Sequence, residues 1–157
     1  MNWRAIIGFE LSWLALAYWQ HWALIPVMLY WLFGMLQLTT KEKLAVLVVL
    51  GCGLVIDSAL MLTGVLVFPA SFWLPVWFVA LWAIFALAAI EVMSAMLTKR
   101  WLAAGLGAIG GPVSYIAGAS ISQGALQFNY GYISYFILAI VWAFIAIGLG
   151  FSRRFYA

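Results

Sequence analysis

Six long apolar stretches, separated by five short polar breaks, dominate the hydrophobic pattern of this chain. Each stretch is long enough to form an α-helix that crosses, or nearly crosses, a hydrocarbon core of about 30 Å. The pattern therefore predicts helices at residues 3–19, 22–38, 44–67, 72–97, 101–122 and 132–151. The first two stretches are near the lower length limit for a membrane span, so a tilted or re-entrant pair of helices is the alternative there.

The composition excludes a water-soluble globular protein. Hydrophobic residues make up 69% of the 157 residues and charged residues only 7%, whereas soluble domains have about 45–50% apolar and about 25% charged residues. Such a chain has too few polar side chains to cover a surface in contact with water. We therefore interpret residues 1–157 as a single integral membrane domain, an all-α bundle of six transmembrane helices with no room for a further domain.

The basic residues all lie at the ends of the apolar stretches. They form four short clusters: Arg4, Lys41 with Lys43, Lys99 with Arg100, and Arg153 with Arg154. If all six helices span the membrane, the four clusters share one side. Because cytoplasmic loops carry an excess of Lys and Arg, this distribution predicts that both termini are cytoplasmic. The net charge of +3 does not indicate nucleic-acid binding, because the basic residues mark helix ends instead of forming one face.

The predicted helix at 101–122 carries the clearest packing signal. Small residues recur on one face at spacings of three and four positions: Ala104, Gly107, Gly111, Ser114 and Gly118. In a membrane such a stripe lets another helix approach closely. We expect it to pack against the third, fourth or sixth helix, or against the same helix of a second copy in a homodimer. Pro112, next to Gly111, leaves a backbone carbonyl free, which is tolerated where it is buried or lines a cavity.

The sequence contains no convincing internal repeat. Two halves of three helices each would have opposite orientations in the membrane, as in transporters built from inverted repeats. The glycines of the stretch at 101–122 have no counterparts in the stretch at 22–38. An inverted repeat is therefore not favoured.

Three of the four acidic residues lie within the apolar stretches, where a charged group is costly and is often functional. Counted from the basic clusters at about 1.5 Å per residue, the polar side chains fall into two layers. We expect an outer layer of His21, Asp57, Ser58, Ser114 and Tyr115, and an inner layer of Glu10, Gln37, Glu91 and Ser94. Glu10 and Glu91 have no basic partner at their expected depth. They would either share a proton as a pair or form separate hydrogen bonds that hold helices together.

Asp57 is the leading candidate for a functional residue. It shares a helix face with the small residue Gly53, which predicts that its side chain points into the bundle. Its role would be ligand binding, proton transfer or catalysis. The structural alternative is a hydrogen bond from Ser114 or Tyr115 that ties two helices together. His21, at a polar break, is either an interface residue or a base or ligand.

No catalytic, metal-binding or cofactor-binding motif is evident. One His and one Cys, Cys52, do not suffice for a His/Cys metal site, and no cofactor is predicted. Ser114 or Ser58 could in principle form a Ser-His-Asp arrangement with His21 and Asp57, but the sequence lacks the nucleophile elbow that is typical of α/β-hydrolases. The sequence also contains no P-loop, dinucleotide or selectivity-filter motif.

Three segments with distinctive spacing cover much of the chain. They are Gly53-xxx-Asp57-xx-Leu60-xxx-Gly64-x-Leu66-x-Phe68, then Pro75-x-Trp77 with Leu81-Trp82-xx-Phe85-Ala86, and then Gly107-xx-Gly110-Gly111-Pro112-x-Ser114-Tyr115-xx-Gly118. Together they resemble a family of small bacterial inner-membrane proteins that is catalogued only as a domain of unknown function. The resemblance implies a multi-pass protein of the bacterial inner membrane, encoded near lipid-modifying enzymes of the cyclopropane-fatty-acid-synthase kind, and it implies no established activity. The Asp57 segment is also similar to the Asp-bearing helix of lysoplasmalogenase-like membrane hydrolases, whose other motifs are not evident here.

These observations favour a bundle that binds a lipid or other apolar small molecule in the outer half of the membrane. The cavity would be bordered by the first, third and fifth helices, with Asp57 as polar anchor or proton carrier and Ser114 and Tyr115 as hydrogen-bonding partners. Membrane lipids and a lipophilic small molecule are the expected partners. Two other classes remain open: acids in both layers would suit a proton-coupled transporter, and the small-residue stripe would suit a non-catalytic assembly subunit.

Overall fold

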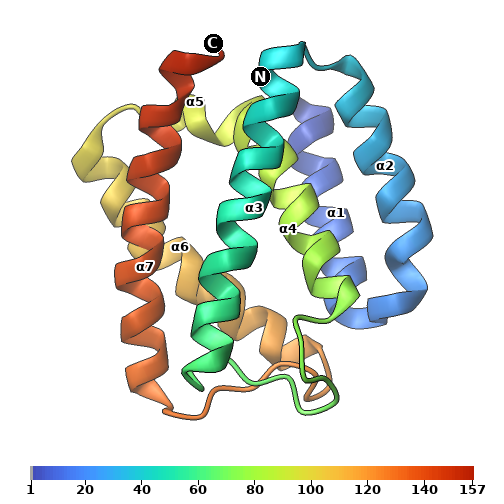
Figure 1. Ribbon diagram of the computed structural model, residues 1–157, viewed down its shortest axis with the longest axis vertical. Helices are drawn as coiled ribbons and strands as arrows, with labels where there is room; N and C mark the ends of the chain where they lie inside the picture. The colour runs from blue at the N-terminus through green and yellow to red at the C-terminus, as the bar shows by residue number, and fades with distance from the viewer. Residues whose placement is uncertain (1) are drawn as a thin grey trace.

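In the computed structural model, which describes residues 2–157, the chain is a bundle of α-helices (Figure 1). The α-helices are α1 (Trp3–Trp19), α2 (Leu24–Gln37), α3 (Thr40–Leu62), α4 (Val76–Ala88), α5 (Ser94–Met96), α6 (Arg100–Ile121) and α7 (Tyr132–Ser152). Two 3₁₀ turns, η1 (Gln20–Ala23) and η3 (Arg153–Phe155), and one π-helical segment, η2 (Ala89–Met93), complete the helical structure. Because η2 connects α4 directly to α5, residues Val76–Met96 form one continuous helix.

Each apolar stretch contains a helix near its predicted position, and local capping shifts the boundaries. α3 begins at Thr40, four residues earlier than predicted, because Thr39 and Glu42 form a reciprocal capping box. It ends at Leu62 because the chain turns at Gly64, whose φ of 78° lies in the left-handed region that glycine adopts without strain. Both boundaries are set by a capping box and a glycine turn, which a hydropathy pattern does not reveal.

Four helical segments are long and apolar enough to cross a membrane: Thr40–Leu62, Val76–Met96, Arg100–Ile121 and Tyr132–Phe155. The protein is therefore a helical membrane protein. α1 and α2 have 17 and 14 residues, which at about 1.5 Å per residue is shorter than a hydrocarbon core of about 30 Å. They form an antiparallel hairpin beside the longer helices (Figure 1). The six-span topology stays a prediction.

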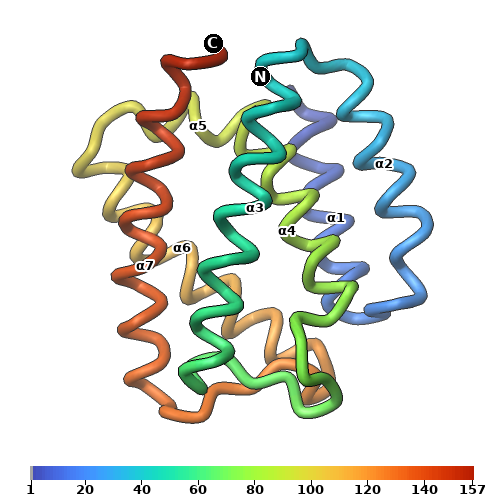
Figure 2. The backbone as a smooth tube through the Cα atoms, in the orientation of Figure 1, coloured from blue at the N-terminus to red at the C-terminus, as the bar shows by residue number. Residues whose placement is uncertain are grey.

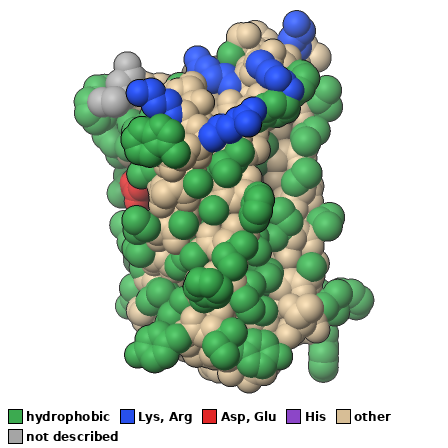
Figure 3. Space-filling model, turned by 90° about the vertical axis from the view of Figure 1, so that its left-hand side faces the viewer, with side chains coloured by type: hydrophobic (Ala, Val, Ile, Leu, Met, Phe, Trp, Pro, Cys, Tyr) green, Lys and Arg blue, Asp and Glu red, His purple; other side chains and the backbone are tan. Residues whose placement is uncertain are grey.

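The basic residues gather at one end of the bundle. The start of α1, the α2–α3 and α5–α6 connections and the C-terminus all lie at this end (Figure 1). Figure 3 shows Lys and Arg side chains there, above a face covered mainly by hydrophobic side chains. The four basic clusters thus lie at the same end of the bundle. Which side of the membrane this end faces stays a prediction.

α4 is the central helix of the bundle. Nine of its residues are buried, and it contacts α1, α2 and α3, with α3 on one side and α1 and α2 on the other (Figure 2). A helix that is hydrophobic on all sides is expected in such a position. Its large aromatic side chains, including Trp82, therefore point into the protein and not into lipid.

Two glycines of the small-residue stripe of α6, Gly107 and Gly111, pack against α7 of the same chain, whereas a Cβ atom at Gly118 would lie 3.8 Å from Trp13 of α1. A Cβ atom at Gly107 would overlap the backbone of Trp142 and the side chain of Ala146, and a Cβ atom at Gly111 would overlap the Trp142 side chain. Of the partners that the sequence leaves open, the structure places α7 against this face. Pro112 is buried within α6. A homodimer stays a prediction.

The loops that follow α3 and α6 have the same local structure. Each contains the pattern Gly-x-Leu-x-Phe, at residues 64–68 and 124–128, and the two glycines have φ angles of 78° and 86°. Val67 and Gln127 pair in an antiparallel bridge, with N–H···O distances of 2.9 and 2.8 Å. Residues that differ by 60 in number thus pair with each other.

The same offset of 60 relates the helices. α3 and α6 begin at Thr40 and Arg100, and the helices after the two loops carry Trp-Ala-x-x-Ala at residues 82–86 and 142–146. The tryptophans of this pattern, Trp82 and Trp142, stack with ring centroids 5.6 Å apart and ring planes inclined by 10°. Contacts between equivalent residues are those that an approximate two-fold axis produces. The expectation that the chain has no repeat is therefore wrong: α3–α4 and α6–α7 are two copies of one unit.

The two units have the same orientation, because α3 and α6 both start at the basic end of the bundle (Figure 1). They form a parallel repeat, a kind related by an axis along the membrane normal, and not the inverted halves that were considered from the sequence. The repeat is hard to see in the sequence because its matching positions are few. They lie among Ala, Leu, Ile and Val residues that are common to membrane helices in general.

We expect cysteine labelling to show that the basic end is cytoplasmic and that the α1–α2 hairpin crosses the membrane. In a Cys52→Ser background, a membrane-impermeant maleimide should modify Phe72→Cys and His21→Cys in intact cells, because both residues are exposed at the opposite end of the bundle. Lys41→Cys should react only after permeabilisation. Labelling of Phe72→Cys without His21→Cys would contradict a spanning hairpin, and labelling of Lys41→Cys in intact cells would reverse the orientation.

Gly111→Ala should lower the free energy of unfolding by about 1–3 kcal/mol, because the added methyl group overlaps Trp142 in a packed interface. Circular dichroism during titration of the protein in mixed micelles with sodium dodecyl sulfate measures this change. Gly105→Ala on the same helix is the matched control, since a Cβ atom there has no neighbour within 4 Å. Equal losses in both variants would mean that the α6–α7 contact does not depend on the glycine.

Candidate functional site

Asp57 is the buried polar centre of the bundle. Asp57 is 1% exposed. Its Oδ2 atom accepts two hydrogen bonds, one from Trp82 Nε1 at 2.6 Å and one from the Tyr115 hydroxyl at 2.5 Å. Its Oδ1 atom is buried and has no hydrogen-bond partner among residues 2–157. Because the three residues come from α3, α4 and α6, this one carboxyl group joins three helices.

Glycines make room for the aromatic rings around Asp57. A Cβ atom at Gly53, one turn before Asp57 on α3, would overlap the Trp82 ring. On its other side Trp82 stacks on Trp142 of α7, which in turn lies against Gly111 of α6. Four helices are therefore held together by two indole rings, and the Trp82 ring is oriented further by its hydrogen bond to Asp57.

Beside this centre, a groove of about 450 Å³ lies between α1, α4, α6 and α7. Its volume is within the range of small-molecule binding sites, about 300–1,000 Å³. Eight of the lining side chains are aromatic: Phe9, Trp13, Trp77, Phe78, Trp82, Phe85, Tyr115 and Trp142. The remaining wall is mostly aliphatic or glycine, including Gly107, Gly110, Gly111 and Gly118 of α6. The groove is suited to an apolar ligand.

The groove differs in its walls from the predicted cavity. α1 and α6 line it, as expected for the first and fifth helices, but α3 contributes no lining residue and α4 and α7 take its place. The expectation that Asp57 itself borders the cavity is therefore wrong. Asp57 lies behind Trp82 and Tyr115, which both line the groove and both donate hydrogen bonds to it.

The exposed lining residues of the groove lie on α1 and α6, which indicates that the groove opens between these two helices. At the end opposite the basic residues these helices are joined, because Gln20 Nε2 donates a hydrogen bond to the Ser122 carbonyl at 3.0 Å. Towards the basic end they diverge, and their starts lie well apart in Figures 1 and 2. The exposed lining residues Glu10, Leu106 and Val113 mark the rim. An apolar molecule in the bilayer could therefore enter from the side.

Of the predicted outer layer, Tyr115 joins Asp57, and the others do not. Ser114 lines the groove but makes no hydrogen bond to Asp57, and His21 is exposed in η1. Ser58 is half-buried on α3. Within residues 2–157, no hydrogen bond connects a serine, His21 and Asp57 into a Ser-His-Asp arrangement.

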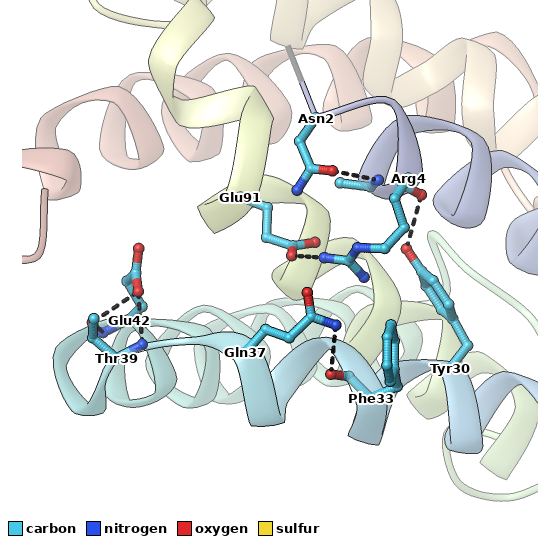
Figure 4. Close-up of polar contacts among 9 residues, drawn as sticks. Asn2, Arg4, Tyr30, Phe33, Gln37, Thr39, Glu42 and Glu91 are labelled. Atoms are coloured by element: carbon cyan, nitrogen blue, oxygen red, sulfur yellow. Dashed lines mark hydrogen bonds and ion pairs between the residues drawn. The ribbon is translucent and has the colours of Figure 1, made fainter.

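The expectation that Glu91 has no basic partner is wrong. Glu91 forms an ion pair with Arg4 (Figure 4), because the Arg4 side chain reaches inward from the first turn of α1. The Arg4 guanidinium also lies 5.9 Å from the centre of the Tyr30 ring and 5.8 Å from that of Phe33, within the range of cation–π interactions. Glu10 lines the groove and Glu91 does not, so the two acids do not form a pair.

Glu91 lies in the π-helical segment η2, and such segments often occur at functional sites. The other two residues of the predicted inner layer have local roles. Ser94 accepts a hydrogen bond from the Tyr156 hydroxyl at 2.8 Å, and Gln37 donates one to the Phe33 carbonyl at 3.2 Å. The inner layer is therefore a set of separate contacts and not one site.

A second, smaller cavity of about 260 Å³ lies between α3 and α7 and is also lined by Trp82. The repeat explains its position. In the repeat α3 is equivalent to α6 and α4 to α7, so the space between α3 and α7 is equivalent to the space between α6 and α4, where the groove lies. Trp82 and Leu149 line both spaces. Trp82 and Trp142 are the site residues that sequence reasoning missed, and the repeated Trp-Ala-x-x-Ala pattern was the signal that could have indicated them.

No group of three or more His, Cys, Asp or Glu side chains that could hold a metal ion occurs in the part of the chain that the structure describes. Residues 2–147 match the model of a family described as "Protein of unknown function (DUF2878)". The chain belongs to this family. The match covers nearly the whole chain, so the predicted resemblance to a family of unknown function is confirmed. No curated protein and no solved structure matches the chain.

We expect Asp57 and Tyr115 to be energetically coupled. Tyr115→Phe should lower the free energy of unfolding by about 1–2 kcal/mol, because it removes a hydrogen bond to a buried carboxyl group. In an Asp57→Ala background the same change should cost much less, and denaturant titration of the four proteins measures the difference. Tyr132→Phe, at an exposed position, is the control. Equal costs in both backgrounds would show that the hydrogen bond contributes nothing.

Proposed function

We propose that this protein binds a lipid or another apolar small molecule in the groove between α1, α4, α6 and α7. The observation that carries the proposal is the groove itself: a largely apolar space of about 450 Å³ that opens sideways between two helices. Helices that only need to pack would close such a space, because a void loses the dispersion contacts of its walls.

The shape of the groove favours a chain-like ligand. Its lining on α6 extends from Leu106 to Gly118, which at about 1.5 Å per residue is about 18 Å along the helix. This is more than half of a hydrocarbon core of about 30 Å. An acyl or isoprenoid chain that lies parallel to the helices would fill such a length.

The wall of the groove is held in place from behind. Trp82 and Tyr115 cannot rotate into the groove without breaking their hydrogen bonds to Asp57, and an unpaired buried polar group costs about 1–3 kcal/mol. A preformed wall lowers the entropic cost of binding. In this proposal Asp57 supports the binding site instead of contacting the ligand.

Ligand binding has more support than proton-coupled transport. A proton path through both layers would need free acids near each end, but Glu91 is paired with Arg4 and Asp57 is tied to two donors. The bacterial inner membrane as location, with both termini in the cytoplasm, belongs to the same proposal.

The test is native mass spectrometry of the protein released gently from its own membrane. Wild-type protein should carry a discrete additional mass, and Gly110→Leu should lose most of it, because the leucine side chain would fill the groove. A Cβ atom at Gly110 meets no atom within 4 Å, so the fold should accept the change. Gly105→Leu, at an equally open position of α6 outside the groove, is the matched control.

Retention of the mass by Gly105→Leu and its loss in Gly110→Leu would support the proposal. If the spectrum of the wild-type protein shows no discrete adduct, or if both variants keep the adduct, the groove is not a specific binding site. Circular dichroism of each variant in detergent checks that the helices remain folded.

A further inference from the structure

Among the described residues that line the groove, Glu10 is the only one with a charged side chain. It is exposed at the rim on α1, and the lining contains no Lys, Arg or His. A ligand with a phosphate or carboxylate group would therefore meet a like charge in the groove and no base. The charge of the groove favours a positively charged group.

Arg4, the only basic residue of α1, does not face Glu10, which lies six positions further along the helix. Arg4 points towards α2 and α4, where it pairs with Glu91 and lies against the Tyr30 and Phe33 rings (Figure 4). A carboxylate without a partner in the apolar part of a membrane is costly. A cationic partner that arrives with the ligand would offset this cost.

Aromatic side chains line the same groove as Glu10. Phe9 and Trp13 of α1 line the groove beside it, and Phe9 meets Phe85 of α4 edge to face at 6.2 Å. Trp142 follows, 5.1 Å from Phe85. Aromatic faces attract organic cations through their quadrupole, and quaternary ammonium groups are recognised in this way.

From this combination we propose that the ligand of the groove is an amphiphile with an organic cation, such as a substituted ammonium group, as its head. The cation pairs with Glu10 at the rim among Phe9, Trp13 and Phe85, and the apolar chain extends along α6 towards Trp77 and Leu126. The inference rests on the proposed function, because it names the class of ligand for the same groove.

Three probes with the same hydrocarbon chain and different head charge test the inference. They are hexadecyltrimethylammonium, hexadecanol and hexadecanoate, each titrated into delipidated protein in dodecyl maltoside and quantified by native mass spectrometry. Wild-type protein should bind the ammonium probe about tenfold more tightly than hexadecanol, and hexadecanoate more weakly than hexadecanol.

Glu10→Gln keeps the shape of the side chain and removes its charge. In this variant the ammonium probe should lose its preference and bind within about twofold of hexadecanol. Glu10→Asp, which keeps the charge, should restore most of the preference. Thermal unfolding followed by circular dichroism verifies that both variants are folded, which is expected because Glu10 is at the surface of α1.

The outcomes separate the two proposals. If Glu10→Gln binds the ammonium probe as tightly as wild type, or if wild type binds hexadecanoate as tightly as the ammonium probe, the cationic ligand is refuted while the groove stands. If wild-type protein retains none of the three probes, or if Gly110→Leu retains hexadecanol as well as Gly105→Leu does, the groove itself is not a binding site and both proposals fail.

Discussion

The stack of Trp82 on Trp142 is the contact on which the arrangement of the apolar spans depends. Each indole ring lies against a glycine, Gly53 on α3 for Trp82 and Gly111 on α6 for Trp142. Helices in a membrane gain little from excluding water, so close packing and buried hydrogen bonds must supply their association. Here large rings fill the spaces that glycines leave, and Asp57 fixes the position of one ring. The stack therefore connects α3, α4, α6 and α7, and both of its rings line the groove.

The internal repeat explains why the stack lies at the centre. Equivalent residues meet on an approximate two-fold axis, at Trp82 with Trp142 and at Val67 with Gln127. The two units have diverged where they meet their different neighbours. The position of Asp57 in the first unit corresponds to Ala117 in the second, and Ala117 lines the groove. One copy thus carries the carboxyl group that supports the wall, and the other carries a small residue that leaves space.

The three acids of the apolar stretches, Glu10, Asp57 and Glu91, have three separate roles. Asp57 joins helices in the interior, Glu91 of η2 pairs with Arg4 of α1, and Glu10 lines the groove. Of these three acids, only Glu10 has no hydrogen-bond or ion-pair partner among residues 2–157. The acid that best explains ligand choice is therefore not the most deeply buried one.

The sequence by itself determined that this is a helical membrane protein, where its helices lie and that its basic residues share one end, because these properties depend on local hydropathy and charge. It also predicted that Tyr115 could donate to Asp57. Counting residues along a helix, however, fixes only the depth of a side chain and not the direction in which it points around the helix axis. Glu10 and Glu91 have similar depths and face different neighbours, and Asp57 has the depth of the groove but lies behind its wall. Only the tertiary structure, which sets the rotation and contacts of each helix, decided these pairings.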